Sequence, residues 1–391
     1  MGARWRTVVT GVAVSGALLT AGCASFTDQP QDWHPQGDLT PQAAPDPQLP
    51  GGSSPQTPGG PKQAPPTKIP PPDGCTDFNP AVIGTCLDKV AAVAALPGDG
   101  SDPVALVGER TTGRILRVKH GTAPQVVATV PVDARTDGGL TGLALSPTYA
   151  EDQLIFAYVT TPTDNRLVRI ALGDTPKPVL TGIPRGPSGN RGALGVDHRG
   201  ALLLATGNAG NPNAAKDPRS MAGKVLRLDA AGKRAADNPA PGSIVASGLY
   251  SPGGVCSALD GSRLWVTDHA PGRDLLYQLQ LGKNLTTPAW SWPDRPGAAG
   301  CVSTPDAVWV AMSKAGHLEN LPLAKDGSFS GKPQVTMAAE EGFGLLGGFD
   351  LVSEQVAVAG TVNKDGGKPV SSDDRAVVIT VSGGSGGGGP D

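Results

Sequence analysis

Residues 103–120 read PVALVGERTTGRILRVKH, two short apolar runs joined by a polar turn. The same pattern returns along the chain, for example in residues 153–172 and 201–229. Runs of five to eight residues that are rich in β-branched and aromatic side chains and are closed by Gly, Pro, Asp or Asn are typical of β-strands. Paired strands repeated over about 300 residues, at roughly 40 to 50 residues per sheet, predict an all-β fold, a six-bladed β-propeller of four-stranded antiparallel blades.

The composition agrees with this fold class, because 55 Gly and 39 Pro among 391 residues disfavour long helices. We place the propeller at residues 74–382, and within it only residues 80–95 permit a helix. The formal net charge is −3, and Lys and Arg are scattered rather than clustered. A nucleic acid is therefore excluded as an expected partner.

The N-terminus has the pattern of a secretory signal over residues 1–22. Arg4 and Arg6 precede an uncharged stretch that ends at Cys23. Its apolar core is shorter than the roughly 20 residues that a membrane-spanning helix needs. The sequence LLTAGC, ending at Cys23, resembles the lipobox of bacterial lipoproteins, in which the cysteine is lipidated. We expect a lipid anchor on the extracytoplasmic face of the cell membrane, with plain signal cleavage as the alternative.

Residues 23–73 hold the lipidated cysteine and a segment of Pro, Gln, Gly, Asp and Ser with almost no aliphatic side chains. Such a composition cannot bury a core, so we predict a disordered, Pro-rich tether. At roughly 3 Å per residue it could hold a domain up to order 100 Å from a membrane. A partner-binding proline tract is the alternative. Residues 383–391 are predicted to form a flexible, Gly-rich tail.

Four cysteines follow Cys23, and an even number outside the cytoplasm favours disulfides. Three pairings are open. Sequence proximity favours Cys75 with Cys86 and Cys256 with Cys301. None of the four has the CxxC spacing of a zinc or redox site.

Several phrases together resemble the glucose/sorbosone dehydrogenase family of soluble quinoproteins. They are GLTGLALSPTYAEDQLIFAYVTT (139–161), AGKVLRLDAAGKRAADNP (222–239) and RLWVTDHAPGRDLL (263–276). The resemblance implies a six-bladed propeller that holds pyrroloquinoline quinone (PQQ) and calcium near the mouth of its axial channel. It also implies sugar oxidation, in which a histidine removes a proton while hydride passes to the quinone.

The family's base does not survive in residues 187–208, PSGNRGALGVDHRGALLLATGN. This stretch resembles the family's HNGGRL approach and the strand that follows it. In that register the catalytic histidine falls on Gly189, Asn190 is retained, and Arg191 takes the place of a glycine. A glycine offers no base. Losing a general base typically costs about 10² to 10⁴ in rate.

The family's cofactor contacts are also thinned. Tyr250 and Ser251 take the places of an arginine and an asparagine that face the quinone, and residues 347–350 (GGFD) match a phrase with two further arginines. A cofactor with three carboxylates needs such positive charge. Other family positions are retained. Lys314 matches a cofactor lysine, Ala270 and Pro271 match positions whose backbone carbonyls bind calcium, and Asp274 matches a family aspartate. Asp137 stands where the family has a sugar-contacting residue.

Three interpretations follow. The first is a propeller with degraded catalytic apparatus and no cofactor, which binds a small molecule or an envelope protein at its channel mouth through Asp137, Asn190, Arg191, Tyr250, His269 and Lys314. The second is a working PQQ- and calcium-dependent sugar dehydrogenase that uses His269 or Asp137 as a non-standard base. The third is a cell-envelope assembly factor that binds protein through the propeller face.

Overall fold

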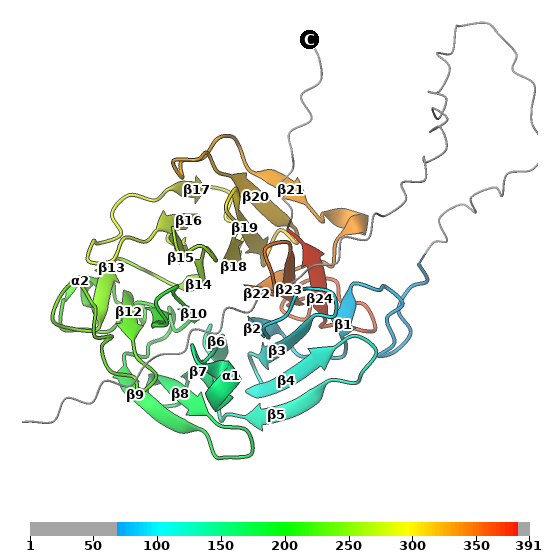
Figure 1. Ribbon diagram of the computed structural model, residues 1–391, viewed down its shortest axis with the longest axis horizontal. Coiled ribbons are helices and arrows are strands. Elements are labelled where there is room, and N and C mark those ends of the chain that lie inside the picture. Colours follow the sequence, from blue (N-terminus) through cyan, green and yellow to red (C-terminus); the bar gives the residue numbers. More distant parts are fainter. Residues whose placement is uncertain (1–68, 382–391) are drawn as a thin grey trace, which may run out of the picture. The chain divides into compact units, whose positions relative to one another are not determined.

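The computed structural model describes residues 69–381, and its strands form six four-stranded antiparallel sheets. Figure 1 shows the six sheets arranged in a ring about a common axis. The predicted six-bladed β-propeller is therefore confirmed. The predicted signal sequence, Cys23, nearly all of the tether and the Gly-rich tail lie outside the described residues.

The first three blades follow one another along the chain. Blade 1 consists of β2 (Val90–Ala95), β3 (Val104–Glu109), β4 (Arg114–Lys119) and β5 (Gln125–Thr129). Blade 2 consists of β6 (Leu140–Leu145), β7 (Ile155–Thr160), β8 (Asn165–Ile170) and β9 (Lys177–Ile183), with helix α1 (Tyr149–Asp152) between β6 and β7. Blade 3 consists of β10 (Gly192–Val196), β11 (Leu202–Thr206), β12 (Lys224–Leu228) and β13 (Ile244–Ser247), with helix α2 (Pro212–Lys216) between β11 and β12.

The remaining three blades complete the ring. Blade 4 consists of β14 (Pro252–Ser257), β15 (Leu264–Ala270), β16 (Arg273–Gln278) and β17 (Trp290–Trp292). Blade 5 consists of β18 (Ala298–Ser303), β19 (Ala307–Met312), β20 (Leu318–Pro322) and β21 (Gln334–Thr336), followed by a 3₁₀ turn, η1 (Ala339–Glu341). Blade 6 consists of β22 (Leu346–Leu351), β23 (Val356–Thr361), β24 (Ala376–Thr380) and β1 (Val82–Gly84). The strands nearest the centre of the ring in Figure 1 are β2, β6, β10, β14, β18 and β22.

Blade 6 closes the ring, because it combines three strands from the end of the chain with one from its beginning. Val82 in β1 pairs with Val377 in β24. The segment 80–95, which permits a helix on sequence grounds, therefore forms strands, and the helical interpretation is wrong. The backbone between its two strands is left-handed at Cys86 and Lys89, with φ of 54° and 50°, which no right-handed helix can contain. All six residues of β2 are buried, as an innermost strand requires.

Both predicted disulfides are present. Cys75 pairs with Cys86, and Cys256 pairs with Cys301, whose Cα atoms lie 5.7 Å apart. The second bond joins β14 to β18, so it ties the innermost strands of two neighbouring blades together. Disulfides of this kind indicate an oxidising, extracytoplasmic compartment. Within residues 69–381, no helix has both the length and the apolar character that crossing a membrane requires.

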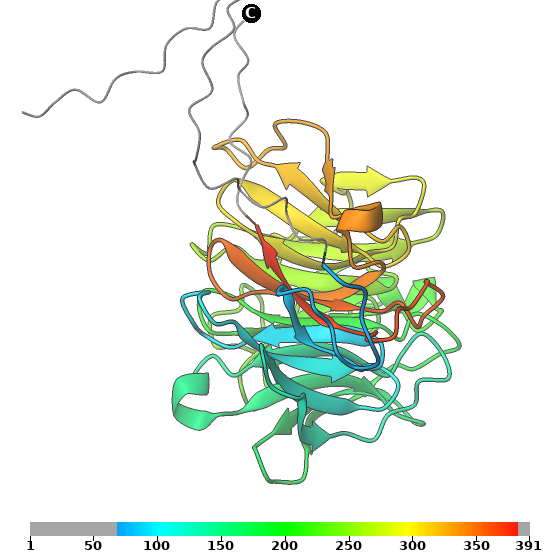
Figure 2. The ribbon, with the colours of Figure 1, turned by 90° about the vertical axis from the view of Figure 1, so that its right-hand side faces the viewer.

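The innermost strands approach one another very closely at the axis. A Cβ on Gly300 in β18 would lie 2.6 Å from the amide nitrogen of Phe349 in β22, and one on Gly253 would lie 2.5 Å from the carbonyl oxygen of Ala298. The axial cavity is correspondingly small, about 30 Å³, with room for no more than a few waters. The two ends of the axis are therefore separate surfaces. Figure 2 shows α1 and α2 projecting from opposite faces of the propeller.

Candidate functional site

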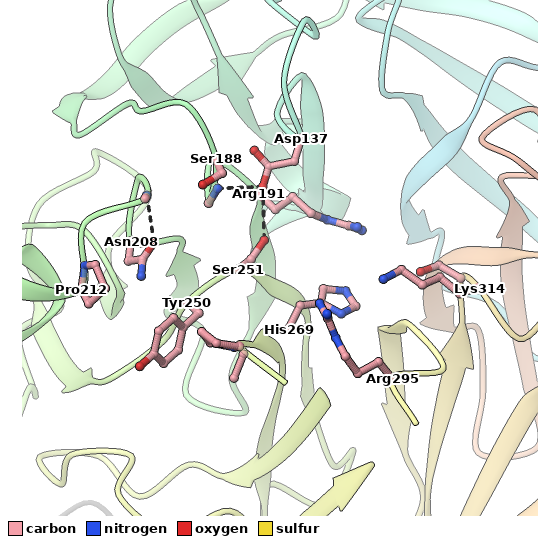
Figure 3. Close-up of a pocket in the computed structure, with 15 residues that line it drawn as sticks. Asp137, Ser188, Arg191, Asn208, Pro212, Tyr250, Ser251, His269, Arg295 and Lys314 are labelled. Carbon is pink, nitrogen blue, oxygen red and sulfur yellow. Dashed lines mark hydrogen bonds between the residues drawn. The ribbon is translucent and has the colours of Figure 1, made fainter. Parts of the chain in front are cut away.

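A cavity of about 540 Å³ lies at the mouth of the axis on the α2 face. Its walls come from the loops that lead into the innermost strands, because Asp137 precedes β6, Arg191 precedes β10, Ser251 precedes β14 and Arg295 precedes β18. A volume of this size suits a small-molecule ligand. The lining, drawn in Figure 3, comprises Asp137, Ser188, Gly189, Arg191, Asn208, Gly210, Pro212, Tyr250, Ser251, His269, Ala270, Pro271, Arg295, Ser313 and Lys314.

The structure brings most of the sequence-predicted residues into this one cavity. The shared members are Asp137, Gly189, Arg191, Tyr250, Ser251, His269, Ala270, Pro271 and Lys314. Asn190 is not among the lining residues. Residues 347–350 are also absent from the lining: Gly348 and Phe349 line the axial cavity, and Asp350 lies at the opposite mouth. Sequence reasoning missed Arg295, which follows the phrase WSWP (290–293) in a loop with no other signal.

Asn190 and Asp137 hold the 189–190 turn in place. The Asn190 side chain is fully buried, and its Nδ2 donates to the carbonyl oxygen of Gly186 at 2.8 Å and to Thr136 Oγ1 at 3.0 Å. The Asp137 carboxylate accepts the backbone N–H of Gly189 at 2.9 Å and that of Asn190 at 3.2 Å. Asp137 is thus occupied as a structural acceptor, and it is a poor candidate for the base.

Gly189 has no room for the family's histidine in this conformation. Its φ is +64°, a left-handed value that residues with a side chain adopt uncommonly, although Asn, Asp and His adopt it more often than the others, so the lack of space comes from the neighbouring atoms. A Cβ there would lie 2.7 Å from Asn208 Oδ1 and 3.1 Å from the carbonyl oxygen of Tyr250. The difference from the family at this position is therefore more than the loss of the histidine side chain, because the surrounding structure leaves no space for one.

His269 supplies an imidazole to the same cavity from the end of β15. Its Nδ1 lies 2.9 Å from Oδ1 of Asp274, which is directly opposite it on β16. Burial opposes ionisation of Asp274, but hydrogen bonds from His269 and from the N–H groups of Gly297 and Ala298 outweigh it and lower the pKa of this carboxyl. An ionised carboxylate can only accept, so Nδ1 carries the proton and Nε2 carries the lone pair. Nε2 is buried and has no hydrogen-bond partner among the described residues.

The protonation state of His269 fits a base. Burial lowers the pKa of the imidazole, the hydrogen bond to Asp274 raises it, and the positive charge of Arg191 lowers it further. The net shift is downward from 6.5, so the ring is neutral at neutral pH. A neutral imidazole with a carboxylate on Nδ1 and a free Nε2 is the arrangement that general-base catalysis uses.

Three cationic side chains line the cavity: Arg191, Arg295 and Lys314. Arg191 is partly buried, whereas Arg295 and Lys314 are exposed at the rim. None of the three makes a side-chain hydrogen bond or ion pair with the residues that the structure describes. The buried Arg227, by contrast, is paired with Asp197 at 2.6 Å. Figure 3 shows Arg191, Lys314 and Arg295 extending into the same part of the cavity, around His269.

The side chains of the described residues do not form a metal site. Within residues 69–381, no cluster of three or more His, Cys, Asp or Glu side chains could hold a metal ion. Asp274, which the family resemblance matched to the calcium region, is fully buried, and its Oδ2 accepts the N–H groups of Gly297 and Ala298 at 2.6 and 3.1 Å. Asp274 therefore positions His269, and the backbone of Ala270 and Pro271 remains the candidate for calcium.

Comparison with known proteins identifies the family. The glucose/sorbosone dehydrogenase family model matches residues 87–299, which is more than half of the chain. The chain belongs to the glucose/sorbosone dehydrogenase family. It is 27% identical over 234 residues to an aldose sugar dehydrogenase of Escherichia coli K12, an alignment that spans 55% of this chain and 62% of that protein's length.

Two solved structures are similar to this chain. The PQQ-bound form of an aldose sugar dehydrogenase from Streptomyces coelicolor superposes with a TM-score of 0.70 at 28% identity, covering 76% of this chain and 95% of that one. An oxidoreductase of Thermus thermophilus, described as a glucose dehydrogenase, superposes with a TM-score of 0.68 at 26% identity, covering 76% of this chain and 98% of that one.

A buried carboxyl beneath the site makes stability depend on pH. Asp268 is fully buried and accepts the N–H groups of Tyr250 and Ser251, at 3.0 and 2.7 Å. Burial raises its pKa from 3.8 to about 7. As the pH rises from 4 to 7, the unfolded chain loses this proton before the folded chain does, so the folded state is progressively destabilised.

We therefore predict that the free energy of unfolding of the wild type falls relative to that of Asp268→Asn between pH 4 and pH 7. The difference is at most about 4 kcal/mol. The asparagine Oδ1 still accepts the two backbone N–H groups but does not titrate. Urea denaturation of both proteins at several pH values measures this difference. The other carboxyl groups are the same in both proteins, so their contributions cancel. Parallel stability curves would contradict the prediction.

Proposed function

We propose that the chain is a PQQ-dependent sugar dehydrogenase in which His269 takes the role of base. The observation that carries this proposal is the His269–Asp274 pair: His269 lines a cavity with three cations that have no partner among the described residues, and its buried Nε2 has no hydrogen-bond partner there either. Family membership and the two enzyme relatives support it. Of the three interpretations of the sequence, the second is thus the best supported.

The cavity fits an anionic cofactor. PQQ carries three carboxylates, and charge-assisted hydrogen bonds from Lys and Arg are the strongest contacts that a protein offers to such groups. Lys314 and Arg295 at the rim would pair with the quinone carboxylates, and Arg191 adds to the positive potential from the floor. The sequence suggested that one lysine remained where the family has several cations. The structure adds Arg295 and places Arg191, which the sequence had already suggested as a contact at the channel mouth, in the same cavity.

The chemistry divides between the cofactor and the chain. When bound, the quinone supplies a two-electron acceptor for the hydride of the sugar carbon. The chain's own residues deal with the proton: the sugar hydroxyl donates it to Nε2 of His269, and Asp274 on Nδ1 orients the ring and stabilises the resulting imidazolium. Nε2 is covered in this structure, so substrate entry must move a neighbouring side chain.

The backbone at position 189 favours a second candidate, a binding protein without catalysis. Asn208 and the backbone of Tyr250 lie too close to Gly189 to leave space for the family's histidine, and Tyr250 and Ser251 stand where the family has quinone contacts. In this case the cavity would still take an anionic small molecule through its cations, or would contact an envelope protein. The two candidates differ in one measurable respect, whether a bound quinone is reduced by sugar.

We predict that the purified chain, reconstituted with PQQ and calcium, reduces an artificial electron acceptor when an aldose is added. His269→Gln removes the proton acceptor and should lower kcat by about 10² to 10⁴. Quinone binding, followed by its absorbance, should persist in this variant. His120→Gln alters an exposed turn histidine outside the cavity and is the matched control, with unchanged kcat expected.

Two results would each contradict one part of this proposal, the dehydrogenase activity or the role of His269. Stoichiometric quinone binding without sugar-dependent dye reduction in the wild type would favour the binding protein. Full activity of His269→Gln would remove His269 from the reaction while leaving the family chemistry in place.

We also propose that the chain is anchored to the extracytoplasmic face of the membrane through a lipid on Cys23. The support is the sequence LLTAGC that ends at this cysteine, together with the two disulfides of the propeller. The Pro-rich tether would then hold the site away from the membrane.

Replacing Cys23 with serine removes the thiol that would carry the lipid. We predict that the Cys23→Ser chain moves from the detergent phase to the aqueous phase in detergent partitioning, or accumulates unprocessed. Cys75→Ser, which breaks a disulfide and leaves the anchor, is the matched control and should stay in the detergent phase. Unchanged partitioning of Cys23→Ser would contradict lipidation.

A further inference from the structure

The proposed chemistry needs no guanidinium next to the base, yet Arg191 provides one. Arg191 belongs to blade 3, directly before β10, and lines the cavity together with His269. Its positive charge acts on His269, whose pKa it lowers, so the two side chains lie near each other. Figure 3 shows the Arg191 side chain extending across the cavity from the Asp137 side toward Lys314, over the region of His269.

The Arg191 side chain has a buried Nε and no partner among the described residues. Arg185 also has a buried Nε without a partner, but its Nη2 donates to Asp133 at 2.8 Å. Arg375, by contrast, donates to Asp373 at 2.9 Å, and Arg227 pairs with Asp197. Burying a charged group without a partner is costly, so such a group marks a place where a ligand supplies the counter-charge.

No carboxylate of the described residues forms an ion pair or a hydrogen bond with the Arg191 side chain. Asp137, Asp274 and Asp365 are the carboxylates whose charges act on its guanidinium. Asp137 is held by the backbone of the 189–190 turn, and Asp274 is held by His269 and two backbone N–H groups. Asp365 lies 3.4 Å from both Lys89 and Arg110. Each of the three is engaged elsewhere.

We propose that Arg191 makes this cavity selective for acidic sugars, with the sugar carboxylate paired to the Arg191 guanidinium while a hydroxyl of the same sugar reaches His269. The inference rests on the proposed function and names its substrate class. A planar guanidinium matches a carboxylate through two parallel hydrogen bonds, which a neutral sugar cannot offer. Arg295 and Lys314 at the rim remain for the quinone carboxylates.

Sugar binding to the full chain without quinone tests this inference. Isothermal titration with D-glucuronate and with D-glucose measures how strongly the acid is preferred over its neutral counterpart. We expect the wild type to bind glucuronate at least about tenfold more tightly, Arg191→Gln to bind the two sugars equally, and Arg191→Lys to retain part of the preference. Thermal unfolding of each variant confirms that it is folded.

Arg295→Gln and Lys314→Gln are the matched controls, because each removes one cation from the same cavity. Both should keep the preference for glucuronate and lose affinity for PQQ. The inference is overturned if the wild type does not discriminate, if Arg191→Gln still prefers glucuronate, or if all three substitutions reduce the preference equally. Because no quinone is present, these outcomes are readable even if the dehydrogenase proposal fails. In a separate assay with PQQ bound, equal oxidation of glucose and glucuronate would contradict this inference and leave the dehydrogenase proposal in place.

Discussion

The structure depends on the close packing of six innermost strands around one axis. Glycines such as Gly253 and Gly300 allow neighbouring backbones to approach within a distance that a Cβ would prevent. The axis consequently holds only about 30 Å³ of free space, and all six strands enter it from the same face. The loops before these strands are therefore forced together at one mouth, and this convergence assembles the site from blades that are distant in sequence.

Charge is what distinguishes this mouth from the rest of the molecule. Arg227 and Arg375, which are buried elsewhere in the propeller, are paired with carboxylates. At the mouth, the carboxylates form hydrogen bonds with other groups of the protein: Asp137 binds the backbone of the 189–190 turn, and Asp274 binds His269. The cations are left to a ligand, and the imidazole is left with one nitrogen that has no partner among the described residues. The same division of labour accounts for both the proposed cofactor and the proposed preference for an acidic sugar.

The fold could be predicted because strand pairs recur with apolar runs and turn residues at regular spacing. The helix permitted at residues 80–95 was wrong because a short run of Ala and Val is compatible with either a helix or a buried strand, and periodicity alone does not separate them. Much of the site was also predictable, since Tyr250, His269 and Lys314 lie in phrases that resemble the family.

The rest of the site depends on spatial proximity that no local pattern records. Arg295 lies in an irregular loop, and it lines the same cavity as Lys314 and Arg191 only because blades 3 to 5 are neighbours around the axis. The sequence matched Asp274 to the calcium region, but its pairing with His269 arises from cross-strand register between β15 and β16. Likewise, the sequence showed that position 189 has no histidine, whereas the close approach of Asn208 and of the Tyr250 backbone, which leaves no space for one, became visible only in three dimensions.

A crystal structure of the chain with bound PQQ tests the central claim most directly, that the unpaired cations and the free imidazole nitrogen form one cofactor and substrate site. The account predicts quinone carboxylates paired with Lys314 and Arg295, and Nε2 of His269 facing open space beside the quinone. A quinone bound away from the α2 face, or no bound quinone at saturating concentration with Nε2 still covered by protein, would contradict it.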